Sequence, residues 1–105
     1  MYIISACLVG ENCKYNGGNN ETRWIVELAE RHRHILVCPE VSGGLPVPRA
    51  PVEIVEGRAI NTEGVDVTAE FRRGCELEWR RIEKMKEECK ETIAGAILNS
   101  ILLLL

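Results

Sequence analysis

The chain lacks several features that would assign it to a common functional class. Its 105 residues contain no apolar run near the ~20 residues of a membrane span, and its net charge of −3 provides no general basic face. No GxGxxG or GxxxxGK[ST] segment occurs, which excludes the usual nucleotide-binding fingerprints, and no CxxC pair is present. We therefore expect no membrane span and no general nucleic-acid binding.

Cysteine is the informative residue type in this otherwise ordinary composition. Hydrophobic residues make up 46% and charged residues 28% of the chain, values typical of one globular domain. The five cysteines follow a start, Met1-Tyr2-Ile3-Ile4, that has no secretory-signal pattern. We expect a reducing, cytoplasmic location, in which thiols serve as small buried residues, metal ligands or reactive groups.

The first third of the chain has the pattern of a strand, a helix and a second strand. Residues 2–6 are apolar and β-branched, residues 21–32 carry apolar side chains including Trp24 at helical spacing, and residues 35–37 are again apolar. A long loop rich in Gly and Asn separates the first strand from the helix. This order favours a parallel strand pair with a right-handed crossover.

The rest of the chain predicts a hairpin, a long helix and a further strand. Residues 52–67 alternate with turn signals, residues 68–90 form an amphipathic helix with a solvated charged face, and residues 93–98 have a buried-strand pattern. On the helix, the expected apolar stripe includes Cys75, Trp79 and Cys89. We predict a single α/β domain over residues 1–100, with a small, mostly parallel central sheet flanked by helices and a β-hairpin insert.

The last five residues, 101–105, form an atypical apolar tail of one Ile and four Leu. An unprotected apolar segment can pack on its own domain, join a second chain or promote aggregation. A homodimer formed through this tail is one expectation.

Two cysteines stand where the predicted parallel strands end. Cys7 and Cys38 follow the first two strands, and the carboxyl edge of a parallel sheet is where such folds place their ligand crevice. Cys13 lies in the loop above the same edge. The alternative is that these are small buried residues at strand ends, as we expect for Cys75 and Cys89 in the helix–sheet core.

Thiolates without histidine partners favour an iron–sulfur cluster or zinc over a hard cation. Glu40 follows Cys38 by two positions, so along an extended segment both side chains would point the same way. A carboxyl group there could move protons, and an exposed loop glutamate is the alternative. Gly43, Gly44 and the donor Arg49 belong to a stiff, turning loop that could hold a small anion or heterocycle.

Three segments carry a family resemblance: SACLVGENCKYNGG at 5–18, VCPEVSGGLPVPRAP at 37–51 and EGRAINTEGVDVTAEF at 56–71. They resemble the signatures of a small bacterial and archaeal family, long classed as a domain of unknown function, that includes the thiouracil desulfurases. The similarity extends over about residues 1–100.

The resemblance implies a compact α/β domain in which three cysteines hold a 4Fe-4S cluster with one open iron. That iron would take sulfur from a thiolated pyrimidine base, releasing hydrogen sulfide and leaving uracil. The roles it implies are cluster ligation for Cys7 and Cys38, acid/base chemistry for Glu40, and part of the site wall for Tyr15, Asn16 and Gly17.

The chain departs from the family pattern after its last predicted strand. Family members continue with a Lys-x-Arg-Ser-Pro-Ser-Cys-Gly type of segment that supplies the third ligand, whereas this chain continues with Leu98-Asn99-Ser100 and the tail. The third ligand would then have to come from Cys13 or from a partner chain, because two thiolates hold an iron–sulfur cluster poorly. One alternative is a non-catalytic family member that keeps the fold or a small-molecule pocket. Another is a zinc-binding structural module that uses Cys7, Cys13 and Cys38 with an outside ligand.

Overall fold

A parallel three-stranded sheet forms the centre of the protein. The structure is a computed structural model and describes residues 1–98. The strand order is β2 (His34–Val37), β1 (Tyr2–Ser5) and β5 (Gly95–Ile97), with β1 in the middle. Ile3 lies opposite Ile35 on one side and Ala96 on the other. The parallel strand pair and its helical crossover are confirmed, as is the α/β fold class.

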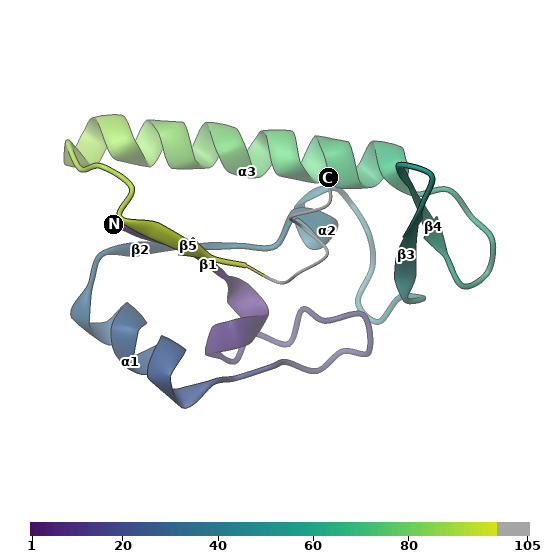
Figure 1. Ribbon diagram of the computed structural model, residues 1–105, viewed down its shortest axis with the longest axis horizontal. Helices are drawn as coiled ribbons and strands as arrows, with labels where there is room; N and C mark the ends of the chain where they lie inside the picture. Colours follow the sequence, from purple (N-terminus) through teal and green to yellow (C-terminus); the bar gives the residue numbers. More distant parts are fainter. Residues whose placement is uncertain (99–105) are drawn as a thin grey trace.

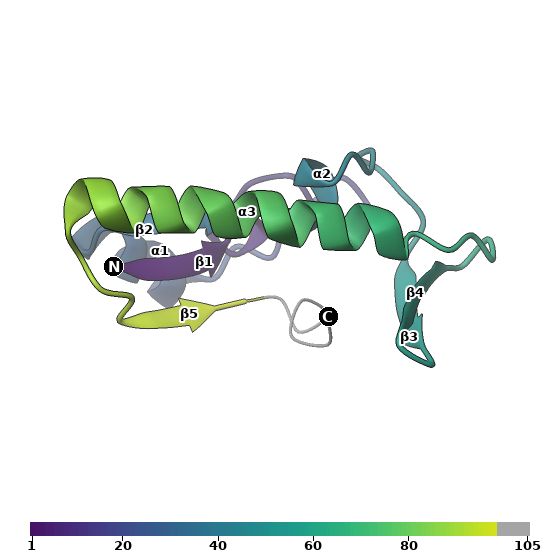
Figure 2. The ribbon, with the colours of Figure 1, turned by 90° about the horizontal axis from the view of Figure 1, so that it is seen from above.

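Helices cover both faces of this sheet (Figures 1 and 2). Helix α3 (Thr68–Cys89) packs on one face, where Ile82 joins the core formed by Ile3, Ile35 and Val37. Helix α1 (Arg23–Arg31) packs on the other face, where Ile25 and Ala29 contact Ile4. Because successive strand residues point to opposite faces, the pair Ile3-Ile4 contributes to both cores.

The expected apolar stripe of α3 was wrong at Trp79, which is 55% exposed. The buried line instead passes through Phe71, Gly74, Glu78 and Ile82, which follow one another at intervals of three or four residues. Trp79 is one residue further on, about 100° round the helix from Glu78. Trp24 of α1 is similarly 58% exposed, so neither tryptophan belongs to the core.

The predicted β-hairpin is confirmed and consists of β3 (Val52–Val55) and β4 (Arg58–Asn61). Its turn residues Glu56 and Gly57 both have positive φ, 49° and 77°, as a type I′ hairpin turn requires. Ala59 packs with Val67 and Phe71. This contact places the hairpin at the N-terminal end of α3, as Figure 1 shows.

The tail at 101–105, and with it the expectation of a homodimer through the tail, lies outside the described residues. The division of the chain at residues 100 and 101 therefore stays a prediction. In the part of the chain that the structure describes, no helix combines the length and the apolar character needed to cross a membrane.

From the hydrogen bonds of Asp66 at the start of α3 we predict that the stability of the fold depends on pH. The Thr68 side chain and backbone amide, together with Arg58, lower the pKa of Asp66 from 3.8 to about 2. A depressed folded-state pKa stabilises the fold above the unfolded value near 4, and this contribution is lost as the pH falls towards 2. We expect urea midpoints measured from pH 5 to pH 2 to fall less steeply for Asp66→Asn than for the unchanged protein. Equal slopes would contradict the assignment.

Candidate functional site

The candidate site lies at the carboxyl edge of the sheet. Ser5 at the end of β1 is in register with Val37 at the end of β2. Cys7 follows β1 in a short 3-10 helix, η1 (Ala6–Val9), and Cys38 directly follows β2. The prediction that the sheet places the two positions at one edge is confirmed, and the reason is the parallel pairing of the strands.

A cavity of about 330 Å³ opens at this edge, and Cys7, Cys13 and Cys38 all line it. Cys7 is buried and the other two are half-buried. Glu40 and Arg49 line the same cavity. These five residues come from the two sequence segments 5–18 and 37–51, and all of them line one cavity.

The Cys13 thiol lies in a site that opposes its ionisation. Burial is the main cause, and the neighbouring thiols of Cys38 and Cys7 add to it, so the pKa of Cys13 rises to about 12 against the weaker opposing effect of Arg49. The Cys13 thiol is therefore protonated at neutral pH in the protein as described. A metal that bound there would have to displace this proton.

The chain between Cys38 and Glu40 is helical rather than extended, so the expected side-by-side alternation was wrong. Cys38 is the N-cap of the short helix α2 (Pro39–Ser42), and Glu40 lies in its first turn. Proline at the first helical position has the φ that a helix start needs and no amide hydrogen to leave unpaired. Pro39 was the sequence signal for this helix, which still leaves Cys38 and Glu40 on one cavity.

Two glycines allow α2 to pack directly on α3. A Cβ atom on Gly74 would overlap the carbonyl oxygen of Pro39, and one on Gly43 would overlap the carbonyl oxygen of Glu70. The two backbones therefore approach more closely than any side chain permits. This contact sets the position of α2 and, with it, of Glu40.

A buried carboxylate adds a polar link between the same helices. Glu78 of α3 is 4% exposed, although the sequence placed it on the solvated face. It accepts hydrogen bonds from Ser42 of α2 and from Arg81, whose Nη2 donates to the carbonyl oxygen of Leu36 at 2.6 Å. A buried carboxylate needs such partners, and here they join α2, α3 and β2.

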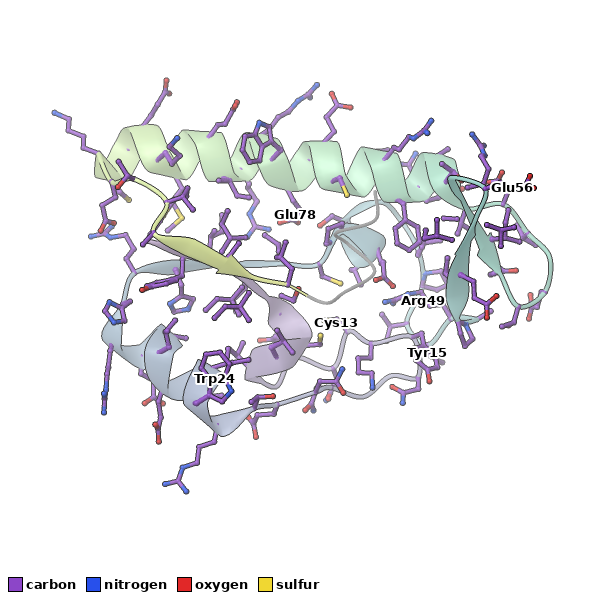
Figure 3. All side chains as sticks on the ribbon, viewed as in Figure 1. Cys13, Tyr15, Trp24, Arg49, Glu56 and Glu78 are labelled. Atoms are coloured by element: carbon purple, nitrogen blue, oxygen red, sulfur yellow. The ribbon has the colours of Figure 1, made fainter. Side chains whose placement is uncertain are left out.

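Arg49 is buried against Glu40 and against the loop that carries Cys13. Its Nη2 lies 2.5 Å from Glu40 Oε2 and 2.9 Å from the carbonyl oxygen of Cys13. The sequence suggested Arg49 as a donor to a bound molecule, and the structure shows its donors directed at protein acceptors. Figure 3 shows Arg49 and Cys13 in the same region of the molecule, below the N-terminal half of α3.

The loop after η1 contributes further side chains to the cavity wall. Tyr15, predicted as a wall residue, lines it, and so do Lys14 and Asn20, for which no site role was predicted from the sequence. The Lys14 ammonium group donates to Asn20 Oδ1 at 2.9 Å and lies 5.8 Å from the centre of the Tyr15 ring. Their position in the sequence could have indicated this role, since both residues lie in the loop between Cys7 and the first helix.

Four other predicted binding residues lie outside the cavity lining: Asn16, Gly17, Gly43 and Gly44. Asn16 closes its own turn by accepting a hydrogen bond from the amide of Gly18. Gly43 packs on α3, as described above, and its carbonyl oxygen accepts hydrogen bonds from Arg73. Substrate contact by these four residues stays a prediction.

The remaining two cysteines do not line the cavity. Cys75 is half-buried on α3, and burial, followed by the charges of Glu40 and Glu78, raises its pKa. Cys89 accepts a hydrogen bond from Nη1 of Arg33 at 2.9 Å. No disulfide joins the five cysteines, all of which fall within residues 1–98.

The fold and site define a small α/β protein with a cavity lined by thiols and a carboxylate at the carboxyl edge of a parallel sheet. The family model for 2-thiouracil desulfurase matches residues 2–100. The chain therefore belongs to the 2-thiouracil desulfurase family.

One curated protein and one solved structure are similar to this chain. The uncharacterized protein YbbK of Bacillus subtilis is 33% identical over 101 residues, which cover 93% of this chain and 67% of YbbK. The solved structure of the [4Fe-4S]-dependent thiouracil desulfidase TudS matches with a TM-score of 0.75 and 37% identity over 90% of this chain. The chain spans 60% of the length of that TudS structure.

The donor set at the cavity fits an iron–sulfur cluster chemically. Three thiols without a histidine are the ligand type that such clusters bind. Within residues 1–98, no three Cys, His, Asp or Glu side chains are arranged to hold a single metal ion. A cluster binds each thiolate through a different iron, so its ligands need not meet at one point.

Proposed function

We propose that this protein removes sulfur from thiolated pyrimidine bases with an iron–sulfur cluster held by Cys7, Cys13 and Cys38. The observation that carries the proposal is the convergence of these three thiols and the Glu40 carboxylate on one cavity. Membership of the 2-thiouracil desulfurase family and the similarity to TudS support it. We place the reaction in the cytoplasm, where the thiols stay reduced.

The net reaction we propose is hydrolysis of the carbon–sulfur bond. That bond breaks, a bond from the same carbon to a water oxygen forms, and both water protons leave with sulfur as hydrogen sulfide. The cluster, when bound, supplies a thiophilic Lewis-acid centre for the sulfur atom. No external oxidant or reductant is needed for this balance.

We assign the proton transfer of this reaction to Glu40. Its Oε2 accepts both hydrogen bonds from Arg49, and among the described residues Oε1 accepts none. Oε1 could take a proton from the attacking water and return it to the departing sulfur. Lys14, Tyr15 and Asn20 in the loop after η1 also line the cavity and offer polar and aromatic contacts to a flat base.

Anaerobic reconstitution tests the proposal. The protein is incubated with iron, sulfide and a thiol reductant, desalted, and assayed for bound iron and sulfide and for the conversion of 2-thiouracil to uracil. We expect a cluster and release of hydrogen sulfide. A folded protein that binds no iron would contradict the proposal, as would one that binds zinc instead when both metals are supplied. A cluster-loaded protein without desulfuration would show that the chain is a non-catalytic family member.

A further inference from the structure

Arg49 connects the two halves of the candidate site. Its side chain is 6% exposed and makes hydrogen bonds from all three guanidinium nitrogens. Nε and Nη2 donate to Glu40 Oε2, Nη2 also donates to the carbonyl oxygen of Cys13, and Nη1 donates to that of Pro46 at 3.2 Å. Its own backbone amide donates to the carbonyl oxygen of Tyr15 at 2.6 Å.

These contacts join segments that the chain brings together from different places. Cys13 and Tyr15 belong to the loop after η1, Glu40 to α2, and Pro46 to the segment that leads to the hairpin. The planar guanidinium group can serve acceptors in several directions at once, whereas a lysine ammonium group on its flexible stem holds none of them in a fixed geometry.

The burial of the Arg49–Glu40 pair makes it sensitive to the loss of one partner. The side chain of Glu40 is 15% exposed, so both charges are largely removed from water and each depends on the other. The Arg58–Asp66 pair, with side chains 51% and 41% exposed, is a contrasting surface pair. Exposed ion pairs of that kind contribute little to the free energy of folding, because water already solvates both charges.

A group with its donors committed in this way is poorly suited to bind a substrate directly. We infer that Arg49 is a positioning residue, which fixes the backbone at Cys13 and the carboxylate of Glu40 relative to each other at the cavity. The catalytic consequence of this placement rests on the proposed function, in which Cys13 is a cluster ligand and Glu40 carries the proton. The placement itself is a property of the protein without a cluster.

Thiol alkylation of the reduced protein without metal tests this placement independently of activity. Iodoacetamide modification of Cys13 and Cys89 is followed by mass spectrometry in the unchanged protein, in Arg49→Lys and in the surface control Arg58→Lys. Lysine keeps the positive charge but loses the multiple hydrogen bonds. We expect the ratio of Cys13 to Cys89 modification rates to rise about tenfold in Arg49→Lys and to stay unchanged in Arg58→Lys.

An unchanged ratio in a folded Arg49→Lys protein would overturn the inference, and so would an equal rise at both cysteines, which indicates general loosening. If Arg49→Lys does not fold, Glu40→Gln provides the second test, because it removes the charged acceptor of Arg49 at the α2 end. We expect Glu40→Gln to raise the Cys13 rate about threefold, and no rise would overturn the inference.

The two proposals can fail separately. Should the unchanged protein bind no cluster, the alkylation ratios still decide the role of Arg49. Should it bind one, a positioning role predicts that Arg49→Lys lowers kcat more than it raises KM for 2-thiouracil, since the lost contacts are to the protein and not to the base. A change confined to KM would instead indicate a direct substrate contact and overturn the inference.

Discussion

Cys38→Ala is expected to lose the iron–sulfur cluster and, with it, desulfuration. Cys38 lines the cavity with the other two candidate ligands, and three thiolates are the fewest that leave a single iron open. Without one of them, a bound cluster would have a second iron open to water and would be held less firmly. After anaerobic reconstitution we expect little bound iron and at least about 100-fold less conversion of 2-thiouracil.

Cys89→Ala is the matched control, because Cys89 is a half-buried cysteine outside the cavity lining. It is expected to keep the cluster and the activity of the unchanged protein. Cys13→Ala tests whether Cys13 is a ligand or only a small buried residue. Loss of iron in this variant would support three-thiolate binding by this chain. A Cys38→Ala protein that keeps its full iron and sulfide content would exclude Cys38 as a ligand.

Gly74→Ala is expected to destabilise the protein although alanine is the better helix former. In an exposed helix interior the exchange stabilises by about 1 kcal/mol. Here the added Cβ would overlap the carbonyl oxygen of Pro39, a backbone atom that cannot move without moving α2. We expect a net loss of at least about 2 kcal/mol in the free energy of unfolding, measured in urea.

The same change is expected to disturb the site, since α2 carries Glu40. Gly43→Ala should act in the same direction, because its Cβ would overlap the carbonyl oxygen of Glu70 on the other side of the contact. Gly18→Ala is the control, as its Cβ would meet only the exposed Asn16 side chain, at 3.1 Å. Equal stability of the Gly74→Ala and Gly18→Ala proteins would contradict the close approach of the two helices.

The sequence by itself determined the parallel sheet and the clustering of cysteines at its edge. Apolar runs at 2–6 and 35–37 separated by an amphipathic helix leave few arrangements other than a parallel pair, and residues that follow parallel strands meet at one edge. Cys7 and Cys38 could therefore be placed together across 30 positions. The motifs around Cys7 and Cys38 were also sufficient to suggest the family that the comparisons show.

Only the tertiary structure decided how that edge is built. The packing of α2 on α3 through Gly43 and Gly74, the burial of Glu78 and the pairing of Arg49 with Glu40 all depend on contacts between distant segments. From the local pattern, a charged residue on a helix is predicted to lie on the solvated face. The pattern carries no information about a partner elsewhere in the chain that would allow the charge to be buried. Side-chain periodicity fixed which strands and helices form, and long-range packing fixed which charges they bury.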